Sequence, residues 1–132
     1  MREVVIIESV RTPVGRRNGV LKDIRPDDLS ALTLKELVTR AGIDPALVED
    51  VIWGCVTQAG EQAGDIARVA TLIADFPIEV PGTTIDRQCG SSQQAVHFAA
   101  QAILAGDMDV VIAGGVESMS RVPMGSNYKG AE

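Results

Sequence analysis

One cysteine has the surroundings of a reactive residue. Cys89 lies in TTIDRQCGSSQQAV, residues 83–96, between a β-branched run and a helical pattern. Charged and polar residues precede it and small residues follow it, whereas a core cysteine lies among Val, Ile or Leu. A thiol at a helix N-terminus meets unpaired N–H groups and a partial positive charge, which favour the nucleophilic thiolate. The pattern predicts a nucleophile. Because free cysteines are often buried, a structural thiol stays open as the alternative.

The residues that follow the cysteine are candidates for substrate binding. Gly90, Ser91 and Ser92 leave room for an acyl group, and their backbone N–H groups could face an oxyanion or a phosphate. The other cysteine, Cys55, lies among apolar residues, so we expect it in the core. The single histidine, His97, lies eight residues into the predicted helix, about 12 Å along its axis at 1.5 Å per residue. It is too far along the helix to serve as the base for Cys89.

Polar residues also follow the last predicted strand. Glu117 and Ser118, in AGGVESMS, lie at the same sheet edge as Cys89, where they either shape a turn or take part in the site. No cluster with metal-ligand spacing occurs, so we predict no metal. Glycine-rich phosphate loops and dinucleotide fingerprints are missing as well. A basic group, Arg11, Arg16 and Arg17, is either a solvated loop or a contact for an anionic ligand.

The order of elements indicates an α/β protein. The periodicity predicts a buried strand over 4–10, a helix over 27–41 capped by Asp27 and ended by Gly42, strands at 50–56 and 82–86, helices from 65 and from 89, and a strand before 118. Such alternation favours a parallel sheet with helices on its faces. The helix that Cys89 begins is apolar almost all round, which predicts a position in the middle of a body larger than 132 residues. The sequence stops as the last strand ends, so we expect a piece of something longer.

Composition narrows the classes of function. The chain has 132 residues, of which 45% are hydrophobic and only 3% aromatic, and its net charge is −6. Nucleic-acid binders show a basic face and stacking aromatics, so this class is excluded. No apolar run reaches the ~20 residues of a membrane span. With two cysteines and no signal peptide, we predict a soluble cytoplasmic protein.

Four segments carry a family resemblance. RTPVGRRNG (11–19), GCVTQAGEQAGDIARVATL (54–72), the long segment from TTIDRQCGSS to GGVESMS (83–120) and VPMGS (122–126) resemble the N-terminal portion of thiolases, the acetyl-CoA acyltransferases. The second segment is more similar to degradative 3-ketoacyl-CoA thiolases. The resemblance implies a layered α-β-α half with a mostly parallel sheet. It also implies that 1–118 form the thiolase N-terminal domain and that 119–132 start a truncated loop region.

The resemblance also implies a reaction. Cys89 would form an acyl-cysteine and exchange the acyl group with coenzyme A, in 3-ketoacyl-CoA thiolysis, as in fatty-acid β-oxidation, or in acetyl-CoA condensation (EC 2.3.1 class). The implied partners are acyl-CoA and CoA, in a homodimer or tetramer, with no nucleic acid, membrane, metal, nicotinamide or flavin. The family's GHP histidine and its second cysteine in C-x-G-G-G do not occur here. We therefore expect the 132 residues alone to be inactive.

Two residues depart from the family pattern. Many thiolases have Asn where this chain has Asp86, and Gly where it has Ser92. The Asp86 charge opposes ionisation of Cys89, and Arg87 offsets it. Two other functions stay open: a ketoacyl-synthase-like condensing enzyme and a non-catalytic binding or assembly module. The acyl chain and the direction of the reaction do not follow from the sequence.

Overall fold

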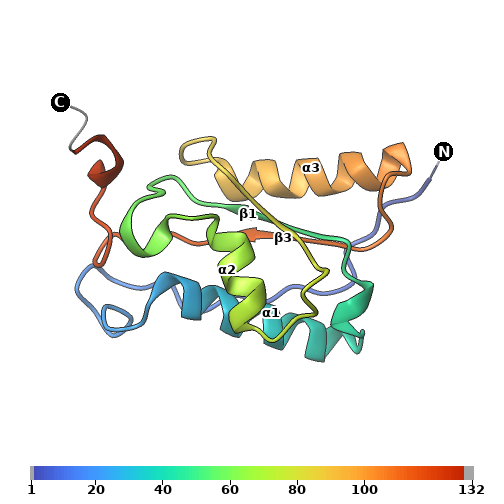
Figure 1. The fold of residues 1–132 in the computed structure, drawn as a ribbon, viewed down its shortest axis with the longest axis horizontal. Coiled ribbons are helices and arrows are strands. Elements are labelled where there is room, and N and C mark those ends of the chain that lie inside the picture. The colour runs from blue at the N-terminus through green and yellow to red at the C-terminus, as the bar shows by residue number, and fades with distance from the viewer. Residues whose placement is uncertain (1, 130–132) are drawn as a thin grey trace.

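The protein alternates helices and parallel strands. A computed structural model describes residues 2–129. Its elements run in the order α1 (Pro26–Ala41), β1 (Asp50–Gly54), α2 (Ile66–Ile73), β2 (Gly82–Ile85), α3 (Ser91–Ala105) and β3 (Val111–Gly115), with short 3₁₀ turns at Pro45–Leu47, Gly60–Gln62 and Ser126–Tyr128 (Figure 1). The predicted α/β class is confirmed.

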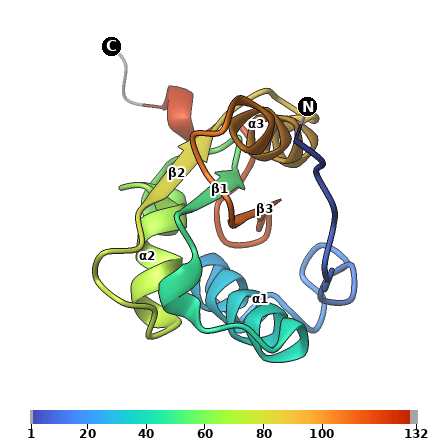
Figure 2. The ribbon, with the colours of Figure 1, turned by 90° about the vertical axis from the view of Figure 1, so that its right-hand side faces the viewer.

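The three strands form one parallel sheet in the order β2-β1-β3. Gly54 at the end of β1 lies opposite Ile85 of β2 and Gly115 of β3, so all three carboxyl ends meet at one edge. Helix α3 covers one face of the sheet, and α1 and α2 cover the other (Figures 1 and 2). This arrangement brings the loops that follow the strands together at a single edge, where parallel α/β proteins hold their sites.

The side chains of β1 divide between two cores. Val51 and Trp53 point to the larger core, shared with α1 and α2. Ile52 points the other way and packs against Ala95 and Ala99 of α3. Because successive strand residues face opposite sides, a strand covered on both faces is apolar throughout. The run of apolar residues in β1 is therefore consistent with its place as the central strand of the sheet.

The ends of α1 partly match the prediction. Gly42 takes the left-handed conformation, with φ +66°, and ends the helix as expected. The predicted cap, Asp27, is wrong, because the helix starts at Pro26 and the cap position is Arg25. Proline fixes the φ angle that the first helical position needs, so the helix starts earlier in the chain, at Pro26. The Asp27 carboxylate instead pairs with the Arg25 guanidinium at 2.7 Å.

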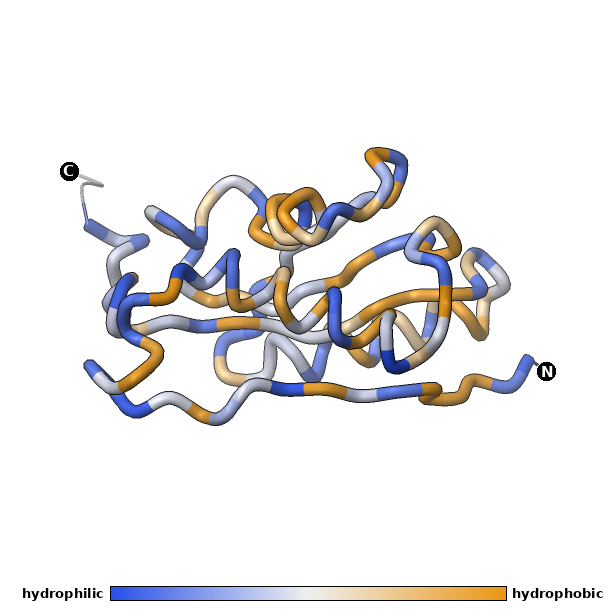
Figure 3. The backbone as a smooth tube through the Cα atoms, turned by 90° about the horizontal axis from the view of Figure 1, so that it is seen from below, coloured by the Kyte–Doolittle hydropathy of each residue, from blue (hydrophilic) through white to orange (hydrophobic). Residues whose placement is uncertain are grey.

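The N-terminal segment does not form the predicted buried strand. Residues 4–10 have no strand pairing in the structure, and Val5, Ile6 and Ile7 are 63%, 81% and 67% exposed. The segment extends from the end of α3, where Arg2 donates to the Ile103 carbonyl at 3.3 Å, toward α1 (Figure 2). Its apolar residues are visible along the lower trace of Figure 3. A groove of about 1300 Å³, lined by residues of this segment and of β3, separates the two. An apolar run forms a buried strand only beside a partner strand, and none pairs with it within residues 2–129.

Helix α3 also differs from its prediction. It starts at Ser91, two residues later than expected, with Gly90 as its cap. Only Ser91, Ala95 and Ala99 are buried. Its exposed residues include three large apolar side chains, Val96, Phe98 and Leu104, which lie among polar ones on different sides of the helix. Within the described residues, one sheet covers this helix on one side only, and its place in the middle of a larger body stays a prediction.

Candidate active site

Cys89 lies on a tight turn between β2 and α3. The N–H of Gly90 donates to the Arg87 carbonyl at 3.1 Å, and the N–H of Ser91 donates to the Gln88 carbonyl at 3.1 Å. Gln88 has φ +48°, in the left-handed region that non-glycine residues seldom adopt. The cysteine is exposed, at the carboxyl edge of the sheet and just before a helix start. The sulfur is therefore accessible, as the sequence predicts, and its role as nucleophile stays a prediction.

Two side chains hold this turn in shape. The Ser91 hydroxyl accepts the Arg87 N–H at 2.9 Å and donates to the Gln88 carbonyl at 2.6 Å. Asp86 Oδ1 accepts the Gln88 N–H at 2.7 Å, an Asx turn that asparagine can also make. The family departure at Asp86 thus preserves the local geometry while adding a charge. Binding of substrate by Gly90, Ser91 and Ser92 stays a prediction.

The first turn of α3 rests on two glycines, Gly54 and Gly115, which we call the glycine seat. A Cβ atom at Gly54 would lie 2.5 Å from the Ser91 carbonyl carbon and 2.9 Å from Ser91 Cβ. A Cβ atom at Gly115 would overlap Ser92 Oγ and lie 2.5 Å from the Gly54 carbonyl oxygen. The seat sets how closely the helix that follows Cys89 approaches the sheet. We did not predict it, although glycine at a strand end is a known signal of close backbone approach.

A polar cluster joins the loops that follow β1 and β3. The Glu117 carboxylate accepts the Val56 N–H at 2.8 Å, the Thr57 N–H at 3.3 Å and the Gln62 Nε2 at 2.8 Å. The Gln62 amide, fully buried, also donates to the Thr57 carbonyl at 2.8 Å and accepts the Ser118 N–H at 2.7 Å. We call Gln62 and Glu117 the clasp. Glu117 thus shapes the turn, one of its two predicted roles, and Gln62 was not predicted from the sequence.

The second cysteine has the opposite environment from Cys89. Cys55 is 1% exposed and packs in the larger core, as expected. Burial, with added repulsion from Glu117 and Asp86, raises the pKa of the Cys55 thiol to about 12. A thiol with that pKa stays protonated at neutral pH and is a poor nucleophile. The single histidine, His97, is exposed on α3.

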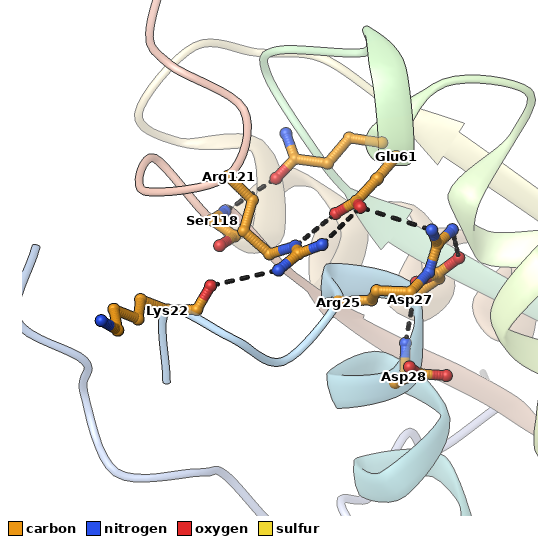
Figure 4. A network of polar contacts seen from close by, with 8 residues as sticks. Lys22, Arg25, Asp27, Asp28, Glu61, Ser118 and Arg121 are labelled. Carbon is orange, nitrogen blue, oxygen red and sulfur yellow. Dashed lines mark hydrogen bonds and ion pairs between the residues drawn. The ribbon is translucent and has the colours of Figure 1, made fainter. Parts of the chain in front are cut away.

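An ion-pair network fixes the chain beyond β3 (Figure 4). Arg121 Nη2 donates to Glu61 at 2.6 Å, and Arg25 Nη1 donates to the same carboxylate at 3.3 Å. The hydrogen bond from Arg121, with its charge, holds the pKa of Glu61 below its ordinary value. For Asp27, burial alone raises the pKa, but the hydrogen bond and charge of Arg25 outweigh it and the pKa is lowered. The network ties the segment after β3 to the start of α1.

Other predicted features lie away from this edge or have no counterpart. Arg11, Arg16 and Arg17 are exposed on the N-terminal loop. Across residues 2–129, His, Cys, Asp and Glu side chains do not gather in a group of three or more that could hold a metal ion. None of the helices in that range combines the length and the apolar character that crossing a membrane requires.

Comparison with known proteins gives the family. The family model of the thiolase N-terminal domain matches residues 4–131. The chain belongs to the thiolase family. A solved acetyl-CoA acetyltransferase from Bacillus anthracis is similar with a TM-score of 0.85 and 45% identity, over 90% of this chain and 30% of that one. The resemblance that the sequence motifs indicated is confirmed.

Two curated thiolases illustrate the range of relatives. The steroid 3-ketoacyl-CoA thiolase FadA6 of Mycobacterium tuberculosis is 56% identical over 126 residues, which cover 96% of this chain and 31% of that protein. The 3-oxoadipyl-CoA/3-oxo-5,6-dehydrosuberyl-CoA thiolase of Escherichia coli is 54% identical over 124 residues, which cover 93% of this chain and 31% of that protein. The chain thus spans about a third of the length of these relatives. The domain boundary at 118 stays a prediction, and residues 130–132 lie outside the described structure.

Proposed function

We propose that this thiolase chain carries the nucleophile of an acyltransferase and that Cys89 forms the acyl-enzyme. The observation that supports this most strongly is the exposed sulfur on a tight turn at the carboxyl edge of the sheet. The high pKa of Cys55 leaves Cys89 as the cysteine of this chain that can react at neutral pH.

The proposed reaction has two half-steps. The Cys89 thiolate attacks the keto carbonyl of a 3-ketoacyl-CoA, a C–S bond forms, and the bond from that carbon to the α-carbon breaks. Acetyl-CoA leaves with the electron pair and takes up a proton. The CoA thiol then loses its proton and attacks the acyl-cysteine, which yields a shortened acyl-CoA and returns the Cys89 thiolate. Covalent catalysis of this kind replaces one difficult displacement with two easier ones. The same steps in reverse condense acetyl-CoA.

The substrate class is a 3-ketoacyl-CoA thioester, and the partners are acyl-CoA and free CoA. The relatives named above act on different acyl groups, a steroid and 3-oxoadipyl-CoA, so the proposal names the class and leaves the acyl chain open. Acyl exchange between thiols transfers no electrons to a cofactor, so we propose no metal, nicotinamide or flavin.

We further propose a cytoplasmic homodimer or tetramer of a longer protein. The exposed large apolar side chains of α3, Val96, Phe98 and Leu104, support coverage by other parts of the assembly. The 132 residues alone do not turn over, because the family's GHP histidine and second cysteine motif do not occur in them.

Intact-mass measurement tests the nucleophile. The full-length protein that contains this chain is mixed with acetyl-CoA, and peptides are mapped before and after addition of CoA. We expect one acetyl group on the Cys89 peptide, its removal by CoA, and no acetylation of the Cys89→Ser variant. Equal labelling of Cys55, or no labelling of the folded protein, would contradict the proposal and favour the non-catalytic binding or assembly module.

A further inference from the structure

Resting on the proposed acyl transfer, we propose that the clasp, Gln62 and Glu117, positions the Cys89 turn. It does so by fixing the ends of β1 and β3 relative to each other, and these two ends form the seat of α3. Neither side chain is proposed to touch substrate. Both act through the backbone on which the reactive turn is built.

The first step is the contact between the seat and the helix. Gly54 closes β1 and Gly115 closes β3, and both lie within van der Waals distance of the first turn of α3. The helix therefore touches two separate strand ends. If one end shifts along or away from the other, the helix start must move or lose a contact. Because the Cys89 turn is hydrogen-bonded to Ser91, it moves with the helix.

The second step is where the backbone pairing of these strands stops. The last backbone hydrogen bond between them runs from the Val116 N–H to the Gly54 carbonyl at 2.9 Å. Beyond that point the Glu117 carboxylate continues the connection by accepting N–H groups of the chain that leaves β1. The clasp thus extends the pairing of β1 and β3 immediately past the glycine seat.

The third step is the rigidity of the clasp. Gln62 has no exposed surface, and hydrogen bonds engage both its amide nitrogen and its amide oxygen. A buried amide with all these partners has one favourable orientation, since a flipped amide would place donors against the Ser118 N–H. Glu117 is exposed but held by three donors.

The opposite ends of the same strands provide a matched control. Before β1, the Glu49 carboxylate accepts the Val110 N–H at 3.0 Å and also the Asp109 N–H, just before β3. Glu49 and Glu117 are both exposed glutamates that bridge these two strands through backbone N–H groups. Only Glu117 lies at the end where α3 begins, next to the Cys89 turn.

The test compares E117Q with E49Q in the full-length protein. In E117Q the amide N–H₂ replaces one of two oxygens that both accept N–H groups. In E49Q the remaining amide oxygen can keep both backbone N–H groups, because Glu49 accepts them with Oε2 alone. Thermal melts measure the loss of stability. Steady-state kinetics and the rate of Cys89 acetylation measure positioning, and the rate of Cys89 alkylation by iodoacetamide measures it without any need for acyl transfer.

We expect E117Q to melt at lower temperature and to lose reactivity, and E49Q to keep the wild-type reactivity. A displacement of the reactive group approaching 1 Å lowers kcat and the acetylation rate by about tenfold to hundredfold, with little change in KM. Equal rates in E117Q and wild type, or equal slowing in E49Q, overturn the positioning role. Should E117Q fail to fold, Glu117→Asp, which withdraws the carboxylate by one methylene, decides by the same comparison. Wild-type protein that is not acetylated contradicts the proposed function instead, and the alkylation rates then still decide the role of the clasp.

Discussion

Replacing Gly54 with alanine tests whether the sheet sets the place of the reactive turn. The new methyl carbon would lie 2.5 Å from the Ser91 carbonyl carbon, whereas ordinary contacts begin at 3.4 Å. The three atoms that it meets, Ser92 N, Ser91 C and Ser91 Cβ, belong to the backbone or are fixed to it, so no flexible side chain can yield. The helix start or β1 must therefore move by at least about 0.9 Å, the difference between the two distances, because the Ser92 nitrogen lies closer still.

This movement has two expected effects. Overpacking of a close contact costs about 1–3 kcal/mol of the free energy of unfolding. Displacement of a reacting group by close to 1 Å slows the chemical step by up to about a hundredfold. We expect Gly54→Ala to lose stability by that amount and to slow alkylation and acetylation of Cys89 by at least about tenfold. Urea denaturation measures the first effect, and mass spectrometry of labelled peptides measures the second under conditions where the protein is folded.

Gly82→Ala is the matched control. Its Cβ atom would lie 2.5 Å from the Arg68 backbone nitrogen, so the clash is as severe, but it falls against α2 at the other end of the sheet. We expect a similar loss of stability with labelling of Cys89 close to the wild-type rate. The reasoning is refuted if Gly54→Ala labels at the wild-type rate, or if Gly82→Ala slows labelling as much.

Three further predictions concern a turn, pH and a buried hydrogen bond. Asp86→Asn keeps a side-chain acceptor for the Gln88 N–H, whereas Asp86→Ala removes it, so only Asp86→Ala should slow alkylation of Cys89 by iodoacetamide; equal rates in the two variants would contradict this. The lowered pKa of Glu61, caused first by its hydrogen bond from Arg121, contributes stability that is present above the ordinary carboxyl value of about 4 and lost as pH falls through the lowered pKa. Glu61→Gln should flatten the pH dependence of unfolding in that acidic range, and an unchanged slope would count against the network. Ser30→Ala removes the acceptor, at 3.1 Å, of the buried tryptophan N–H and should cost about 1–3 kcal/mol by urea denaturation; no measurable loss would mean that the indole finds another partner.

Local signals in the sequence were sufficient to place Cys89. Turn-forming residues, a helical period and a β-branched run together predict a cysteine between a strand and a helix, and the structure has it there. The same reasoning failed for residues 4–10, because an apolar run becomes a buried strand only when another strand lies beside it. Burial of this kind depends on a distant partner, which the run itself does not encode.

The residues that hold the site in place, the clasp and the glycine seat, could not be predicted from the sequence for a related reason. Gln62 and Glu117 are 55 positions apart, and nothing in either local pattern indicates that they meet. Gly54 looks like an ordinary glycine at a strand end until α3 is placed over it. The predicted cap at Asp27 lies two residues beyond the observed cap at Arg25, since Pro26 and Asp27 are both suitable for the first turn and only the backbone angles decide where the helix starts.

The one-sided pairing of β3 has a practical consequence. Among the residues that the structure describes, Val111–Gly115 bonds to β1 on one side and presents bare peptide groups on the other. An unpaired strand edge of this kind can pair with a strand of a neighbouring molecule. The exposed side chains of Val5, Ile6 and Ile7, beside the adjoining groove, add apolar surface. A preparation of these 132 residues by themselves should therefore aggregate as its concentration rises. Low protein concentration or a solubilising fusion partner should keep it in solution.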